Sequence, residues 1–360
     1  MMSARLFTMK TPSIFSILTA TALVGIGATA FAQVATEPVG FISQDVPANS
    51  DAVIGVPLYR AAAFKGKIDS ISGNVITVVG TPGFTADQFV QDISVQPAPQ
   101  PSTFVVSLAT GSKEGLTATI TANGTNTLTV IPAEGDDLTG LATEQADGAG
   151  NGDEIDIIPL WTPGTLFPDG VTAGVQLLLI PNGAAGVNLG ANPILFSNGT
   201  GWLNSNNGFA DATHLPLRFG QGLIMRNTSG SPITVTSVGA VPMSSHRLVI
   251  RTLADNTPQD VWFSYASPVP TFIGTAGLGF SPGDQLLAFD NSATGINKAA
   301  TDILFYNGAG GWLDSNNGFA NVNGTFELKP GFGYVFRKAA TPTPQTFVWQ
   351  DVQTYLTPAP

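Results

Sequence analysis

The chain contains one sequence twice. Residues 201–210 read Gly-Trp-Leu-Asn-Ser-Asn-Asn-Gly-Phe-Ala, and they recur as residues 311–320 with one difference, Asn204 against Asp314. Longer flanking segments match as well, namely 176–199 with 285–308 and 217–226 with 328–337. A repeat at a spacing of roughly a hundred residues indicates that one structural unit was duplicated. The sequence therefore predicts two copies of the same fold.

The chain has the pattern of an all-β protein. Its short apolar or alternating runs, each bounded by Gly, Pro, Asn or Asp, lie at 75–79, 117–121, 128–131, 177–180, 233–235, 248–250 and 261–265. Runs of this length and pattern are typical of strands. Helical periodicity is scarce, and only residues 86–90 are expected to form a short helix.

The first copy of the repeat is interrupted. The second copy starts with two expected strands, 246–251 and 259–264, whose counterparts 39–43 and 50–56 lie near the N-terminus. The segment between these counterparts and the rest of the first copy has two hairpin signals and about five expected strands, which suits a small SH3-like or OB-like barrel. We therefore expect this barrel to be inserted into the first of two tandem β-sandwich-like repeats.

The chain divides into four expected parts. These are a signal peptide (1–32), a discontinuous first repeat (38–62 plus 159–243), an inserted small β-barrel (63–158) and a second repeat (244–350). The signal peptide is indicated by Arg5 and Lys10, an apolar stretch and an Ala-x-Ala cleavage site at 30–32. No later stretch has the ~18 uninterrupted apolar residues of a membrane span. The mature protein is expected to be exported, to the periplasm or to the extracellular space or cell surface.

Charge and composition disfavour several functions. The formal net charge is −11 without a cluster of Lys and Arg, so the protein repels the phosphates of nucleic acids. Cysteine is absent and there are 2 histidines, which disfavours thiol chemistry and a multi-histidine zinc site. Acidic residues near the repeated motif differ between the copies; Asp211, for example, aligns with Asn321. These observations predict a protein that is not an enzyme.

The repeated motif supplies the main ligand candidates. They are Trp202, Asn206 and Asn207 in the first copy, and Trp312, Asn316 and Asn317 in the second. An exposed aromatic ring beside amide groups can hold a sugar by stacking and directional hydrogen bonds. The alternative is that each tryptophan fills the core of its repeat and that the polar residues only form a turn.

An acidic loop is a weak candidate for calcium. Asp147, Asn151, Asp153 and Asp156 could supply oxygen ligands, but position twelve of the loop is Ile158 instead of the glutamate of an EF-hand. The alternative is a solvated acidic loop. No other cofactor is expected.

Two further residue pairs need an interpretation. Arg226 and Arg337 follow an apolar strand at the same position in both copies, where they either bind an acid or form a salt bridge at the strand end. His214 and His246 lie in no catalytic motif, and we expect both at the surface or in turns.

Several further motifs resemble those of a known family. They are Pro-Val-Gly-Phe at 38–41, Gly-Lys-Ile-Asp-Ser-Ile-Ser-Gly-Asn at 66–74, and the segments 113–123, 157–168 and 282–287. Through these motifs, nearly the whole mature chain resembles a paralogous family of exported, uncharacterised bacterial β-rich proteins. The resemblance implies export and this module layout. Because that family has no known activity, the resemblance implies no chemistry.

Three functions follow as hypotheses. The first is an exported non-enzymatic protein with a structural or surface-associated interaction role, and the second is a carbohydrate-binding module that uses Trp and Asn-rich loops on a polysaccharide or another cell-surface component. The third is a glycan hydrolase that depends on carboxylates alone. Exposed tryptophan rings would favour the second, and two carboxyl groups ~5–10 Å apart in a cleft would favour the third.

Overall fold

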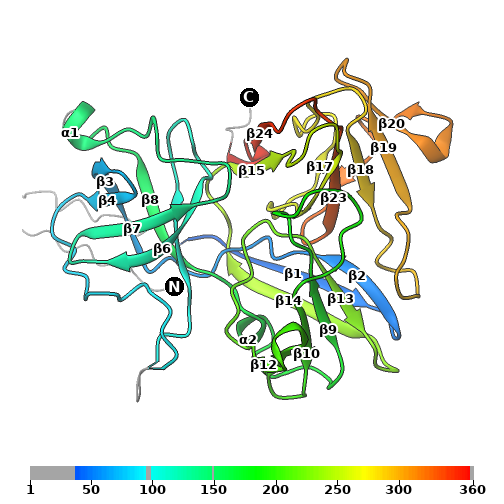
Figure 1. Cartoon of the computed structure of the whole chain (residues 1–360), viewed down its shortest axis with the longest axis horizontal. Helices are drawn as coiled ribbons and strands as arrows, with labels where there is room; N and C mark the ends of the chain where they lie inside the picture. Colours follow the sequence, from blue (N-terminus) through cyan, green and yellow to red (C-terminus); the bar gives the residue numbers. More distant parts are fainter. Residues whose placement is uncertain (1–36, 95–98, 148–149, 357–360) are drawn as a thin grey trace, which may run out of the picture. The chain divides into compact units, whose positions relative to one another are not determined.

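Strands dominate the computed structural model of the protein (Figure 1). The structure describes residues 37–94, 99–147 and 150–356, so the expected signal peptide lies outside the described residues. The α-helices in this part of the chain are single turns, α1 (Glu144–Asp147) and α2 (Pro163–Leu166). The all-β prediction is thus confirmed. Among the described residues, no helix is long and apolar enough to cross a membrane.

The first repeat is built on a 6-stranded antiparallel sheet. Its strand order is β12 (Ala210–Asp211), β11 (Trp202–Asn204), β10 (Ile194–Ser197), β9 (Gln176–Leu179), β13 (Leu223–Asn227), β2 (Ser50–Ile54). A 2-stranded ribbon of β1 (Val39–Val46) and β14 (Ile233–Ala240) accompanies it. β1 and β2 precede the barrel in the chain, yet they pair with β14 and β13, which follow it. The barrel is therefore inserted between strands of one sheet.

The second repeat has the same topology without an insertion. Its sheet follows the order β16 (Gln259–Ser264), β23 (Gly333–Lys338), β18 (Gln285–Ala288), β19 (Asp302–Tyr306), β20 (Trp312–Asp314), β21 (Ala320–Asn321). β15 (His246–Arg251) pairs with β24 (Thr346–Asp351), as β1 pairs with β14. A short additional pair consists of β17 (Thr271–Phe272) and β22 (Glu327–Leu328).

The inserted module is a closed barrel of six strands, where the sequence predicts about five. In order around the barrel they are β3 (Phe64–Ser72), β4 (Val75–Val78), β7 (Thr127–Pro132), β6 (Thr117–Asn123), β5 (Phe104–Leu108) and β8 (Glu154–Pro159). The additional strand is β5, in which every residue is buried. A strand buried on both faces lacks the alternation by which strands are recognised in a sequence.

The expected helix at 86–90 is wrong. These residues form a series of turns, and Asp87 has a left-handed φ of 55°, which a helix cannot contain. The backbone N–H of Phe89 donates to the side chain of Asn123 instead of to a helical carbonyl. The Phe89 ring is nevertheless buried, because it packs into the core of the barrel beside Phe84 and Phe104.

Strand alternation gives each repeat sheet two different faces. In β9, Leu177 and Leu179 enter the core of the first repeat, while Leu178 points to the opposite face. We call this opposite side the outer face. Near β2 and β16 the outer faces of the two sheets meet, and Val53, Ile180, Trp262 and Val335 form a shared apolar cluster there.

The two repeats are joined by an exchange of loops. We call residues 180–193 and 289–301, which follow β9 and β18, the junction loops. Asn182 binds the edge strand of the other repeat: its Oδ1 accepts from the Trp262 N–H at 2.8 Å, and its Nδ2 donates to the Trp262 carbonyl at 2.8 Å. Asn291 makes the same two bonds to Val53, each at 2.8 Å. Each asparagine thus satisfies the free backbone edge of β16 or β2, as a neighbouring strand would.

A partly buried ion pair lies beside each asparagine. Arg226 binds Asp51 with two hydrogen bonds of 2.8 and 2.9 Å, and the N–H of Asn297 from the other repeat donates to the same carboxylate at 2.7 Å. Arg337 binds Asp260 at 2.7 and 2.9 Å, and the N–H of Asn188 completes that group at 2.7 Å. The repeated arginines therefore form salt bridges, which was one of their two interpretations.

Glycines allow the repeats to approach closely at the same junction. A Cβ on Gly222 would lie 2.7 Å from the carbonyl oxygen of Phe263, and one on Gly333 would lie 2.9 Å from that of Ile54. Both glycines occur in the repeated Gly-x-Gly segment that opens β13 and β23. Their recurrence follows from this backbone contact.

Asn182→Ala and Asn291→Ala should each lower the free energy of unfolding by about 1–3 kcal/mol, because each leaves a buried backbone N–H and carbonyl unpaired. Urea denaturation followed by circular dichroism measures the change. The exposed Asn207 makes no side-chain hydrogen bond within the described residues, so Asn207→Ala serves as the control, with a change within about 0.5 kcal/mol. Equal stability of the two junction variants and this control would contradict the role of the junction loops.

Candidate functional site

The repeated motif folds as the same capped turn in both copies. Residues Ser205–Asn207 and Ser315–Asn317 are 3-10 turns, each followed by a glycine with a left-handed φ of 59°. The single difference between the copies is conservative in structure. Asn204 accepts from the Asn206 N–H at 2.9 Å, and Asp314 accepts from the Asn316 N–H at 2.8 Å.

The tryptophans of the motif are not available to a ligand. Trp202 is 2% exposed and Trp312 is 1% exposed, and each belongs to the core of its repeat. The Trp312 Nε1 donates to the carbonyl of Leu278 at 3.0 Å. Of the two interpretations of these tryptophans, the structure agrees with the one in which each fills the core of its repeat, because both rings point to the inner face of the sheet and are closed to a sugar.

The exposed aromatic residue of the motif is its phenylalanine. Phe209 is 57% exposed and Phe319 is 55% exposed. Both residues have a left-handed φ of 59°, which costs a residue with a Cβ roughly 1–2 kcal/mol. The two copies thus retain the same exposed ring in the same unfavourable backbone conformation.

Each exposed phenylalanine is part of an apolar surface on the outer face. The ring of Phe209 lies 6.0 Å from that of Phe196, and the ring of Phe319 lies 5.7 Å from that of Phe305. We call these surfaces the aromatic platforms; they consist of Ile194, Phe196, Leu203 and Phe209 in the first repeat and Ile303, Phe305, Leu313 and Phe319 in the second. All eight residues are at least partly exposed, and the two sets are identical in residue type. The motif alone does not distinguish buried from exposed rings; the strand register does.

The predicted asparagines flank these platforms with different roles. Asn206 accepts from the Ile194 N–H at 2.9 Å, and Asn316 donates to the Thr301 carbonyl, so both support the turn. Asn207 and Asn317 are exposed and make no side-chain hydrogen bond within the part of the chain that the structure describes. Their amides are the free polar groups of the motif.

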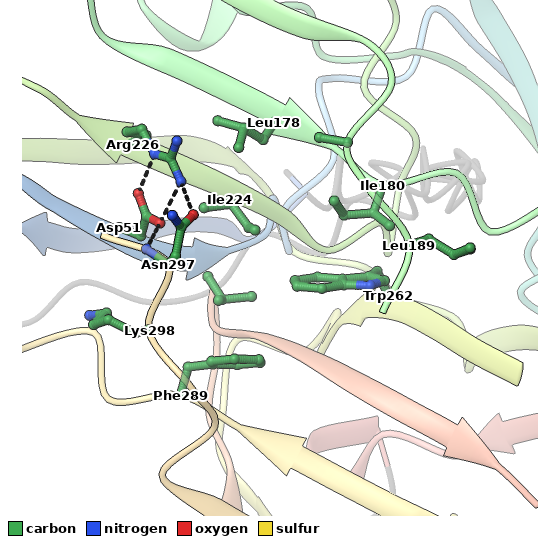
Figure 2. A pocket seen from close by; sticks show the side chains of 13 residues that line it. Asp51, Leu178, Ile180, Leu189, Ile224, Arg226, Trp262, Phe289, Asn297 and Lys298 are labelled. Atoms are coloured by element: carbon green, nitrogen blue, oxygen red, sulfur yellow. Dashed lines mark hydrogen bonds and ion pairs between the residues drawn. The ribbon is translucent and has the colours of Figure 1, made fainter. Parts of the chain in front are cut away.

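A pocket of about 220 Å³ lies where the outer face of the first sheet meets the second repeat (Figure 2). Leu178, Ile180 and Ile224 form one apolar wall, and the rings of Trp262 and Phe289 form another. These two rings are stacked, with centroids 6.0 Å apart and planes at 18°. One end of the pocket is polar because it contains the ion pair of Asp51 and Arg226 with Asn297.

A larger cleft of about 640 Å³ lies between the barrel and both repeats. It contains the carboxylates of Glu134 and Asp136, which are candidates for the carboxylate pair of the third hypothesis. Arg247 occupies both oxygens of Asp136, at 2.8 and 3.2 Å, and Arg251 forms an ion pair with Glu134. Arginine partners therefore engage both carboxylates of the cleft.

Two of the calcium candidates, Asp153 and Asp156, form bonds within the protein. Asp153 accepts from the Ala142 N–H at 2.8 Å, and Asp156 forms an ion pair with Lys65 at 3.0 Å. Burial raises the pKa of Asp156 above its usual value, although the neighbouring Lys65 acts in the opposite direction. Among the described residues, no group of three or more His, Cys, Asp or Glu could hold a metal ion. The calcium prediction is not supported at these residues, because their carboxylates are bonded within the protein; the side chain of Asp147 lies outside the description.

His246 is buried, which contradicts its expected place at the surface. It is 2% exposed, and neither ring nitrogen has a hydrogen-bond partner in the described structure. Burial lowers its pKa from 6.5 to about 4. Asp351 lies opposite His246, on β24. Burial raises the pKa of Asp351 from 3.8 to about 6, although the hydroxyl of Tyr265 donates a hydrogen bond to its carboxylate at 2.8 Å.

These two groups should have opposite effects on stability below neutral pH. The lowered pKa of His246 costs stability as pH falls from 6.5 towards 4, whereas the raised pKa of Asp351 adds stability as pH falls through 6. Each pKa unit corresponds to about 1.4 kcal/mol. Between about pH 7 and pH 4, the free energy of unfolding of Asp351→Asn should therefore fall by about 3 kcal/mol relative to that of wild type. His246→Phe should gain stability relative to wild type over that range. Urea denaturation at both pH values measures the difference, and parallel pH profiles for all three proteins would refute it.

No family model, curated protein or solved structure matches this chain. The site must therefore be interpreted from its own geometry.

Proposed function

We propose that this is an exported, non-enzymatic interaction protein that attaches to a polysaccharide through its two aromatic platforms. The observation that carries the proposal is the exposed phenylalanine with a left-handed φ, which occurs at the same position in both repeats. The arginine-bound carboxylates of the large cleft support a role without catalysis.

The backbone conformation argues that the phenylalanines do not serve the fold. Glycine adopts a positive φ without the steric cost that a side chain adds, so it would suit positions 209 and 319 better than phenylalanine. Burial offsets little of that cost, since each of these residues is more than half exposed. Strained residues at the surface are characteristic of functional sites.

The chemistry of the platforms suits a sugar. A flat aromatic ring offers an apolar face to the C–H groups of a pyranose, and a nearby amide supplies directional hydrogen bonds. Asn207 and Asn317 provide such amides in the turns that carry Phe209 and Phe319. Charged residues are not needed for this type of contact, and the platforms contain none.

Duplication favours a ligand with repeating units. Two equivalent platforms on one molecule allow a polymer to be held at two places, and the second contact then forms at a high effective concentration. Weak binding by each platform would be sufficient for stable attachment. A soluble monosaccharide would not benefit from this arrangement.

Phe209→Gly combined with Phe319→Gly should abolish retention on the polysaccharide that the wild-type protein binds in a panel of insoluble cellulose, chitin and peptidoglycan. The free energy of unfolding should stay the same or rise by about 1 kcal/mol, because glycine relieves the left-handed strain. Pull-down and urea denaturation measure the two effects. Each single variant should retain partial binding.

Phe41→Ala is the matched control, since Phe41 is 68% exposed but lies on β1, outside the platforms. It should leave retention unchanged. The proposal fails if the double glycine variant still binds like wild type, or if wild type binds no member of the panel. It also fails if the wild-type protein forms a dimer and the double glycine variant is a monomer, because the platforms would then be a contact surface between two copies of the chain.

A further inference from the structure

The junction between the two repeats contains some residues that are the same in both copies and some that differ. The residues that hold the junction together are the same in both copies: Asn182 and Asn291, Asp51 and Asp260, Arg226 and Arg337, Asn188 and Asn297. The apolar residues around them are not. By the repeat alignment, Val53 corresponds to Trp262, Ile180 to Phe289 and Leu189 to Lys298.

These differences explain why the 220 Å³ pocket lies on the first sheet. Val53 and Ile180 are smaller than Trp262 and Phe289, and they leave space above the outer face of the first sheet. Trp262 and Phe289 of the second repeat enclose this space as a stacked pair of rings (Figure 2). The pocket is therefore lined by residues that differ between the copies, in an interface whose bonds are otherwise shared.

The polar end of the pocket offers donors and no free acceptor. Both oxygens of Asp51 are engaged, by Arg226 and by the Asn297 N–H. Within the described residues, the Nη1 of Arg226 and the Nδ2 of Asn297 have no hydrogen-bond partner. The buried Nε1 of Trp262, on the side of its ring away from this polar end, also has none (Figure 2). A ligand that enters this pocket must therefore bring acceptors.

The charge of the lining favours an anion. Arg226 and Lys298 outnumber the single carboxylate, Asp51, although the protein as a whole has a net charge of −11. Lys298 lies at the rim, where its ammonium donates to the carbonyls of Asp290 and Ala293 at 2.6 and 2.9 Å without an ion-pair partner among the described residues. Leu189, the residue that corresponds to Lys298 by the repeat alignment, is uncharged and also lines the pocket.

We propose that this pocket binds a small aromatic carboxylate. Its ring would lie between the apolar wall of Ile180 and Ile224 and the rings of Trp262 and Phe289, and its carboxylate would face Arg226 and Asn297. A volume of about 220 Å³ accommodates one aromatic ring with a short substituent, since a cavity of roughly 150 Å³ holds benzene. This site is separate from the aromatic platforms and does not depend on a role in polysaccharide binding.

The probe is benzoate, with benzyl alcohol as its uncharged analogue and acetate as the anion without a ring. Titration calorimetry should detect binding of benzoate to the full chain, weaker binding of benzyl alcohol and none of acetate. Absence of benzoate binding would overturn the proposal, and so would equal or tighter binding of benzyl alcohol.

Two variants fill the pocket and two change charges. Gly190 lines the pocket and a Cβ on it would meet no atom within 4 Å, so Gly190→Leu adds an apolar side chain there without a clash at its Cβ. Ile180→Phe installs the residue that the second repeat already has at this position. Each should weaken benzoate binding by ~10-fold or more. Lys298→Leu, the residue of the first repeat, should weaken benzoate but not benzyl alcohol. Arg218→Leu, which alters the 640 Å³ cleft, should change neither.

Thermal unfolding verifies that each variant is folded. The proposal is wrong if folded Gly190→Leu and Ile180→Phe bind benzoate like wild type, and equally if Arg218→Leu loses binding while they retain it. The double variant of Phe209→Gly and Phe319→Gly should bind benzoate normally. This last result separates the pocket from the polysaccharide proposal.

Discussion

The structure depends on the exchange of junction loops between the two repeats. β2 and β16 are edge strands, and an edge strand presents unpaired N–H and carbonyl groups that invite aggregation. Asn291 and Asn182 satisfy those groups from the other repeat, while the paired Asp and Arg residues fix the strands beside them. The edge strand of each repeat is thus paired by an asparagine of the other, and the pocket lies at the same contact.

The identity between the copies serves two different ends. In the core, Trp202 and Trp312 are retained because each fills the interior of its repeat. On the outer face, Phe209 and Phe319 are retained although they are exposed and strained. Burial in the core accounts for the first pair but not for the second, which is largely exposed. At the junction, the residues that form hydrogen bonds and ion pairs are the same in both repeats, but Val53 of the first repeat corresponds to Trp262 of the second. Both of these residues line the pocket on the first sheet.

Much of the architecture could be predicted from local pattern. The strands at 117–121 and 177–180 and the duplicated order of the sheet follow from alternation, turn residues and self-similarity. β5 escaped prediction because a fully buried strand has no polar alternation, and 86–90 was misassigned because its apolar spacing is helical while Asp87 adopts a left-handed φ. Burial of His246 was equally invisible, since a lone histidine carries no sign of its surroundings in the sequence.

The sequence by itself determined that the chain is all-β, that one unit occurs twice, and that a barrel interrupts the first copy, because these follow from residue periodicity and repetition along the chain. Only the tertiary structure decided which ring of the repeated motif meets solvent and which residues of one repeat bind the other. The reason is physical: a shift of one residue in a strand reverses the face of a side chain. Contacts such as that of Asn291 with Val53 join positions far apart in the chain, and no local pattern encodes their distance.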